Sequence, residues 1–91
     1  IEKEIVATTS EPTMQLIQRA GEIIIEASDE DGIQEVRLNL NGKQYANQIN
    51  GEKNIQLGPV QLQEGNNTIL VEVTNISGYT KRASTELQYT P

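Results

Sequence analysis

The chain has 91 residues, a formal net charge of −6, 35% hydrophobic residues and only 3% aromatic residues. This length suits a single domain and leaves too few residues for a second core. The negative charge would repel nucleic acid and anionic membrane surfaces, and the few aromatic rings offer no platform on which bases could stack.

The first segment, residues 1–11, is polar and weakly patterned. Pro12 follows it, and a proline cannot donate a hydrogen bond to a strand ladder. Residues 1–11 are therefore expected to form a linker or a short edge strand, and residues 12–91 one β-sandwich domain. Because the chain begins without Met, we also expect it to be a segment of a longer protein.

Strand patterns become dense from residue 13 onward. Apolar residues expected to face inward alternate with residues expected to face outward over residues 14–16 and 22–27. This is the period-2 pattern of half-buried strands. A turn is predicted over residues 28–32, because Gly32 can take a positive φ and the acidic residues before it favour turns. The inward-facing residues predicted here are Met14, Leu16, Ile23, Ile25 and Ala27.

The clearest strand pattern places Val36, Leu38 and Leu40 on one face. Asn41-Gly42 follows at once, and this dipeptide between two patterned runs is the strongest short-range hairpin signal. The return strand is expected over residues 43–49. The sequence therefore predicts a two-residue hairpin at this point.

Three further interruptions of the strand pattern follow. A second Asn-Gly pair, Asn50-Gly51, predicts another turn. Gly58-Pro59 predicts an edge position or a bulge, because Pro59 cannot donate to a ladder. Residues 64–67 are expected to form a turn.

The last part of the chain repeats the strand pattern. Ile69, Val71 and Val73 share one face, residues 75–78 predict a turn, and residues 79–89 a final strand. Turn signals recur about every 8–12 residues, and no apolar pattern of helical period is sustained. The sequence thus predicts an all-β fold of about seven antiparallel strands in two sheets, with no helix longer than a turn.

Two stretches carry a family resemblance: ASDEDGIQEVRLNLNGKQY, residues 27–45, and LQEGNNTILVEVTNISGYT, residues 62–80. They resemble the bacterial immunoglobulin-like (or fibronectin-III-like) modules that occur as repeats in large secreted or cell-surface proteins. Asn75 stands where such modules usually have Asp, and Tyr79 where they usually have Asn. The residues that match the family pattern are Gly32-Ile33, Asn41-Gly42, Leu62, Gly65, Asn67, Ile69, Val71, Val73 and Gly78.

The resemblance implies an immunoglobulin-like β-sandwich and an extracellular or cell-surface location in bacteria. It implies a non-catalytic structural or accessory module, either a spacer or a packing domain, whose partners are neighbouring domains of the same polypeptide. The alternative is an adhesive or ligand-binding module for a protein or a carbohydrate, acting through loops or an exposed edge strand. An exposed apolar patch, for which Ile24 and Leu70 are candidates, would favour that alternative.

The side-chain inventory limits the chemistry of the chain, because it has no histidine and no cysteine. A serine or cysteine nucleophile normally needs a histidine base, and structural zinc sites need cysteine or histidine ligands. We expect no catalytic, cofactor-binding or metal-binding residues, no cofactor and no intrinsic enzyme activity; an accessory place in a larger enzyme stays open. The longest aliphatic run, Ile23 to Ile25, is far shorter than the ~20 residues of a membrane span.

The acidic run Asp29, Glu30 and Asp31 is the one motif that suggests an ion. Carboxylate oxygens are the ligands that calcium prefers, but a calcium loop needs six or more ligands and Gly32 arrives too early for an EF-hand register. Acidic residues are also common in turns because they cap local N–H groups. A structural turn is the favoured interpretation, and calcium binding remains open.

Overall fold

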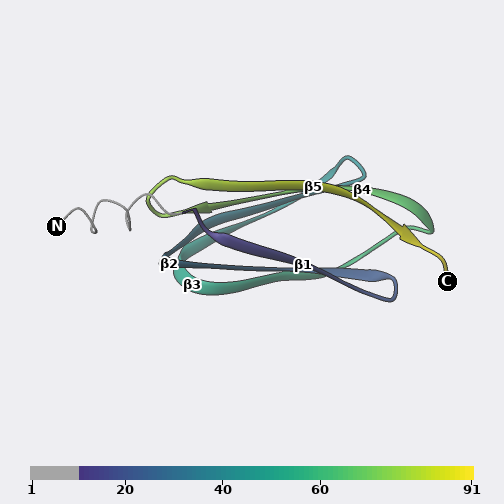
Figure 1. Cartoon of the computed structure of the whole chain (residues 1–91), viewed down its shortest axis with the longest axis horizontal. Helices are drawn as coiled ribbons and strands as arrows, with labels where there is room; N and C mark the ends of the chain where they lie inside the picture. Colours follow the sequence, from purple (N-terminus) through teal and green to yellow (C-terminus); the bar gives the residue numbers. More distant parts are fainter. Residues whose placement is uncertain (1–10) are drawn as a thin grey trace.

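The computed structural model describes residues 11–91, so the expectation for residues 1–11 lies outside the described residues, except at Glu11. The described chain is all-β, with antiparallel strands and no helix, as predicted (Figure 1). Within this part of the chain, no helix is available that is long and apolar enough to cross a membrane. The strands are β1 (Thr13–Arg19), β2 (Glu22–Leu40), β3 (Lys43–Gln61), β4 (Gly65–Asn75) and β5 (Thr80–Tyr89).

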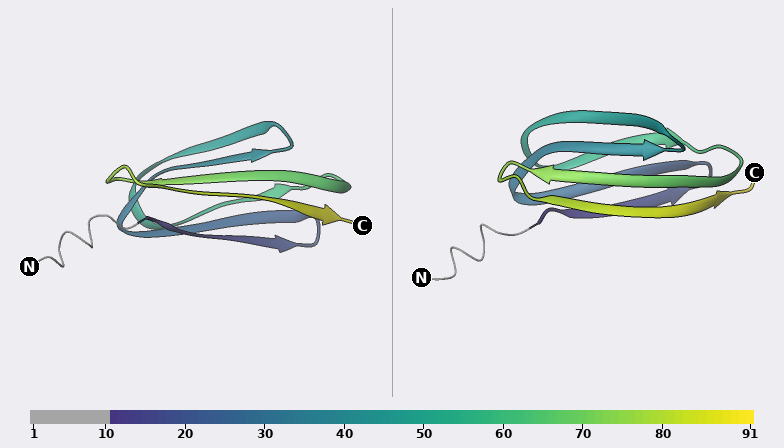
Figure 2. Two further views of the ribbon diagram at one scale, coloured as in Figure 1. Left: turned by 45° about the horizontal axis from the view of Figure 1, so that its top comes forward. Right: turned by 90° about the horizontal axis from the view of Figure 1, so that it is seen from above.

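Two strands of 19 residues each, β2 and β3, organise the sheet. Residues 22–28 of β2 pair with β1 and with residues 54–61 of β3. Residues 33–40 of β2 pair instead with β4 and with residues 43–52 of β3, and β5 pairs with β4. Because β2 exchanges β1 for β4 along its length while β3 follows β2 throughout, the sheet curls over itself, as Figure 2 shows from two further directions.

Residues 22–28 with their partners form one half of the sheet and residues 33–40 with theirs the other, and we call the bend between them the corner. The corner corrects two predictions. The turns expected over residues 28–32 and at Asn50-Gly51 are wrong, because β2 and β3 run through both positions as strands with shifted registers. Gly32 has a φ of 108° and Gly51 a φ of 81°. A Cβ at Gly32 would lie 2.3 Å from the Gly51 carbonyl oxygen. The glycines therefore bend each strand and bring the two backbones together, without reversing the chain.

The buried core lies inside the curl and joins both halves of the sheet. The alternating residues predicted to face inward in β2 and β4 are buried, so those predictions are confirmed. Met14 and Leu16 of β1 are half-buried and pack against them. The buried hydrophobic residues are Ile23, Ile25, Ala27, Ile33, Val36, Leu38, Leu40, Leu57, Leu62, Ile69, Val71 and Val73.

Of the remaining interruptions, the turn expected over residues 64–67 is wrong for residues 65–67, because β4 begins at Gly65 and the connection covers residues 62–64. The others agree with the sequence. Asn41 and Gly42 both have positive φ, at 54° and 89°, and Leu40 pairs with Lys43 across a two-residue hairpin. The ladder shifts register opposite Gly58-Pro59, which confirms the predicted bulge. Residues 76–78 form the predicted turn between β4 and β5.

The different surroundings of two positive-φ glycines give a stability prediction. Gly42→Ala should cost about 1 kcal/mol of unfolding free energy, since it adds only backbone strain and its Cβ would meet nothing within 4 Å. Gly32→Ala adds a collision with the Gly51 carbonyl to the same strain, so its cost should reach about 3 kcal/mol. Urea unfolding of both variants measures the difference. Equal losses would show that the corner does not depend on this close approach.

Candidate functional site

The acidic run lies at the corner, where its carboxylates accept hydrogen bonds within the fold. Asp29 Oδ2 accepts the Asp31 backbone N–H at 2.9 Å, and its Oδ1 accepts the Asn75 Nδ2–H at 3.1 Å. Asp31 Oδ2 accepts the Ser77 hydroxyl at 3.4 Å. Across residues 11–91, no group of three or more Asp, Glu, His or Cys side chains gathers in a way that could hold a metal ion. The structure therefore gives the acidic run a role in joining β2 to the β4–β5 turn.

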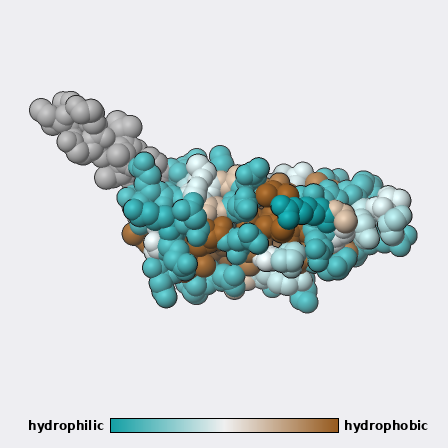
Figure 3. Space-filling model, turned by 90° about the horizontal axis from the view of Figure 1, so that it is seen from below, coloured by the Kyte–Doolittle hydropathy of each residue, from teal (hydrophilic) through white to brown (hydrophobic). Residues whose placement is uncertain are grey.

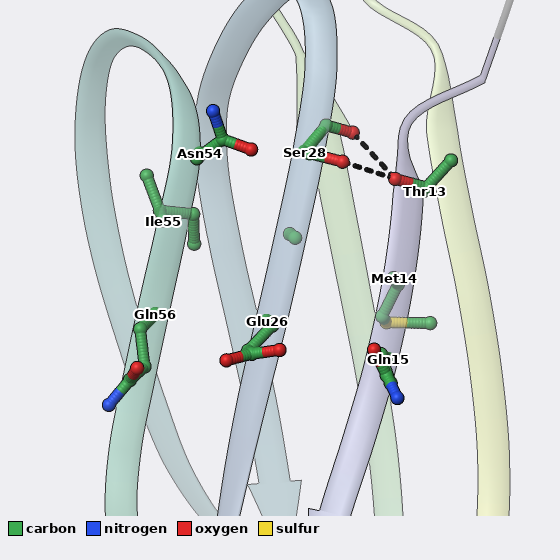
Figure 4. A pocket seen from close by; sticks show the side chains of 9 residues that line it. Thr13, Met14, Gln15, Glu26, Ser28, Asn54, Ile55 and Gln56 are labelled. Carbon is green, nitrogen blue, oxygen red and sulfur yellow. Dashed lines mark hydrogen bonds between the residues drawn. The ribbon is translucent and has the colours of Figure 1, made fainter.

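A groove of about 510 Å³ crosses β1, β2 and the second half of β3 (Figure 4). Cross-strand pairing builds it from two polar rows. In one row Ser28 pairs with Thr13 and Asn54, and in the other Glu26 pairs with Gln15 and Gln56. Period-2 alternation places these six side chains on the same face of the sheet. Met14, Ala27 and Ile55 also line the groove, but they lie between the two rows and pack in or against the core.

The two rows differ in how many hydrogen bonds their polar side chains make within the fold. The Thr13 hydroxyl donates to the Ser28 carbonyl at 3.2 Å and also contacts the Ser28 hydroxyl. The side chains of Gln15, Glu26 and Gln56 make no hydrogen bond to any other described residue. One carboxylate between two amides can hold hydroxyl or amide groups of a ligand, but it provides no acid–base pair and no activated nucleophile.

The exposed apolar surface is small. Among the described residues, the exposed large hydrophobic side chains are Ile76, at 53%, and Tyr79, at 38%, both beside the β4–β5 turn. Ile24 and Leu70, the candidates for an apolar patch, are half-buried and lie on different halves of the sheet. On the underside of the molecule, apolar side chains gather along the middle of the face, flanked and partly covered by polar ones (Figure 3).

Two buried asparagines are the polar groups that sequence reasoning did not single out for a role in the core. Asn67 and Asn75 are both fully buried and lie on the inner face of β4, in line with Ile69, Val71 and Val73. The signal was present in the sequence, because the alternation of β4 extends by one step in each direction to an asparagine.

Asn67 connects three segments at one end of the molecule. Its Oδ1 accepts the Asn41 Nδ2–H and the Gln63 backbone N–H, both at 2.9 Å. Its Nδ2 donates to the carbonyls of Gln63, Gly65 and Leu87, at 3.0, 3.2 and 3.4 Å. The amide therefore ties the β2–β3 hairpin and the β3–β4 loop to β5.

Asn75 connects the strands at the opposite end. Its Oδ1 accepts the Tyr79 backbone N–H at 2.9 Å, while its Nδ2 donates to Asp29. Its backbone N–H donates to the Tyr79 carbonyl at 2.9 Å, and its carbonyl accepts the Gly78 N–H at 3.0 Å. The position where the resembling modules usually have Asp is thus filled by an amide that closes the β4–β5 turn against β2.

Comparison of the chain with protein-family models, with curated proteins and with solved structures finds no match in any of the three.

Replacing one of two adjacent asparagines tests the role of the buried amide. Asn67→Ala should lower the unfolding free energy by about 3 kcal/mol, because it leaves several buried backbone groups without a partner. Asn66→Ala is the matched control: the side chain is exposed, and the change should stay within about 0.5 kcal/mol. Thermal or urea unfolding compares the two. Similar losses from both variants would contradict the assignment.

Proposed function

We propose that the chain is a non-catalytic structural or accessory module, a spacer or packing domain, of a larger bacterial extracellular or cell-surface protein. We further propose that its curled sheet is an immunoglobulin-like β-sandwich of about seven strands in two sheets. The corner supports this, because the partner change of β2 and the register shift between β2 and β3 divide both strands into two segments each, which together with β1, β4 and β5 makes seven. The location and the bacterial origin rest on the resemblance of residues 27–45 and 62–80.

The observation that carries the proposal is the position of the first and last described residues at opposite ends of the domain. We call the entry end the region formed by Glu11, residues 28–32 and residues 75–80, where Lys81 Nζ lies 3.9 Å from Glu11 Oε1. The exit end contains the β1–β2 turn and the end of β5, where Gln18 Nε2 donates to the Gln88 carbonyl at 3.1 Å. Figure 1 shows these regions at opposite ends of the long axis. Neighbouring domains joined at residues 11 and 91 would therefore be held apart.

The strands that separate the two ends are continuous. β4 alone has 11 residues, which corresponds to about 35 Å of extended chain. β1 and β5 both run from the entry end to the exit end, and each is hydrogen-bonded along its length to an antiparallel neighbour. A pull on the two ends of the chain acts along both strands and loads their hydrogen bonds together. This is the geometry in which a sheet resists separation, and it suits a spacer.

The spacer proposal predicts a dependence of unfolding force on the direction of pulling. The chain contains no cysteine, so introduced cysteines can carry the handles. Handles at Glu11→Cys and Pro91→Cys load β1 and β5 in shear, and single-molecule pulling should give a severalfold higher unfolding force than handles at Glu11→Cys and Ile76→Cys. The second pair lies wholly at the entry end and opens the β1–β2 ladder one pair at a time.

The melting temperatures of both doubly labelled variants must match before the forces are compared, because a destabilised variant would unfold at lower force for another reason. Equal forces in the two geometries would remove the mechanical argument for a spacer.

The groove of Figure 4 favours one alternative, a ligand-binding module for a carbohydrate or a protein. It lies beside the edge of β1, which among the described strands pairs only with β2 and has no acidic residue and no proline within Thr13–Arg19. Its unengaged amides and carboxylate suit a ligand rich in hydroxyl or amide groups. Against it, exposed aromatic rings are scarce: Tyr45 and Tyr89 pack against the core.

A binding screen distinguishes this alternative from the spacer. If the groove binds a ligand found on an oligosaccharide or peptide array, Glu26→Ala should weaken the affinity by about tenfold, since a hydrogen bond to a charged group is lost. The control is Glu86→Ala, an exposed carboxylate on β5 of the other half. Binding that both variants retain, or the lack of any ligand on the array, would count against the groove and leave the spacer proposal untouched.

A further inference from the structure

Two Asn-Gly dipeptides occur in the chain, and the structure gives them different surroundings. In any Asn-Gly pair the backbone nitrogen of the glycine can attack the side-chain amide carbon of the asparagine, because glycine has no side chain to obstruct the approach. The attack requires the side chain and the following peptide to rotate towards each other. A fold that holds both in place suppresses the reaction, and one that leaves them free permits it.

At Asn41-Gly42 both reacting groups are held. Asn41 Oδ1 accepts the Thr68 backbone N–H at 2.8 Å, and its Nδ2 donates to Asn67 Oδ1 at 2.9 Å. The Asn41 backbone N–H donates to the Thr68 carbonyl at 2.9 Å. The attacking group, the Gly42 N–H, donates to Asn39 Oδ1 at 3.0 Å. Several hydrogen bonds must open before this pair can react.

At Asn50-Gly51 the side chain is free. Asn50 is exposed, and its amide makes no hydrogen bond to any other described residue. The pair lies where the β2–β3 register passes from Gln48 to Glu52, so neither residue has a ladder partner on β2. Nothing lies within 4 Å of the position of a Cβ at Gly51. The Asn50 side chain is therefore free to turn towards the Gly51 nitrogen, and the side of Gly51 on which a Cβ would stand is open.

We propose that Asn50 is a site of spontaneous deamidation and that Asn41 is protected from it by the fold. The Gly51 nitrogen forms a bond to Asn50 Cγ, the Cγ–Nδ2 bond breaks, and the amide leaves as ammonia after proton transfer. The product is a five-membered succinimide. Water then adds to one of its two carbonyls, and ring opening gives either aspartate or isoaspartate at position 50.

The modification would act on the corner of the sheet. Either product adds a negative charge beside Glu52 in a chain whose net charge is already −6. Isoaspartate also adds one methylene to the main chain of β3, next to the point where the Gly51 carbonyl lies against Gly32. The packing of the two backbones leaves no room at that contact, so the isoaspartyl form should melt at a lower temperature than the unmodified chain.

The test is to incubate the folded chain in mildly alkaline buffer and to follow both asparagines by peptide mapping and mass spectrometry. Asn50 should lose its amide about tenfold faster than Asn41 or more, since three hydrogen bonds protect Asn41. In the urea-unfolded chain both sites should react at similar rates. Asn50→Gln should abolish the fast reaction and leave the slow one unchanged.

Equal rates at the two sites of the folded chain, or a faster reaction at Asn41, would overturn the proposal. So would a folded chain that retains both amides over the time in which the unfolded chain loses them.

Discussion

At the corner of the sheet, Gly32 of β2 lets the backbone of β3 at Gly51 approach more closely than a side chain at position 32 would permit. A Cβ at Gly32 would lie 2.3 Å from the Gly51 carbonyl oxygen, so this contact exists only because the side chain is missing. The approach allows β2 and β3 to bend together, and β2 passes from β1 to β4 at this bend. The apolar faces of the two halves of the sheet then close on one core.

The core is closed at its two ends by neutral amides, and the chemistry of the amide explains why. An asparagine side chain both donates and accepts, so Asn67 can satisfy N–H and carbonyl groups of the loops at once. Asn75 donates to the Asp29 carboxylate and accepts from the backbone of Tyr79. An aspartate at position 75 would have no hydrogen to donate and would place a second negative charge against Asp29. The departure from the family pattern thus matches the acidic run that faces it.

Alternation and turn chemistry predicted the inward-facing residues of β2 and β4 and the Asn41-Gly42 hairpin, because these depend on neighbours in the sequence. Two of the wrong turns, at residues 28–32 and at Asn50-Gly51, have the same composition as true turns. Whether such a segment reverses the chain or bends a continuing strand depends on a contact between Gly32 and Gly51, which local sequence does not contain. The sequence did not predict the polar groove for the same reason. Its rows come from three strands, and none of its residues is unusual by itself.

Several polar groups at the two ends of the molecule are engaged in holding the fold. Asp29, Asp31, Asn41 and both buried asparagines are committed to hydrogen bonds that join loops to strands. The exposed ion pairs, such as Arg82 with Glu72 at 2.6 Å, contribute little to stability because solvent screens them. Stability therefore resides in the aliphatic core, the glycine corner and the two asparagines, while the surface is free to change. A module whose stability comes from its interior can keep the distance between its ends while its surface residues change to suit different neighbours. A spacer requires this property.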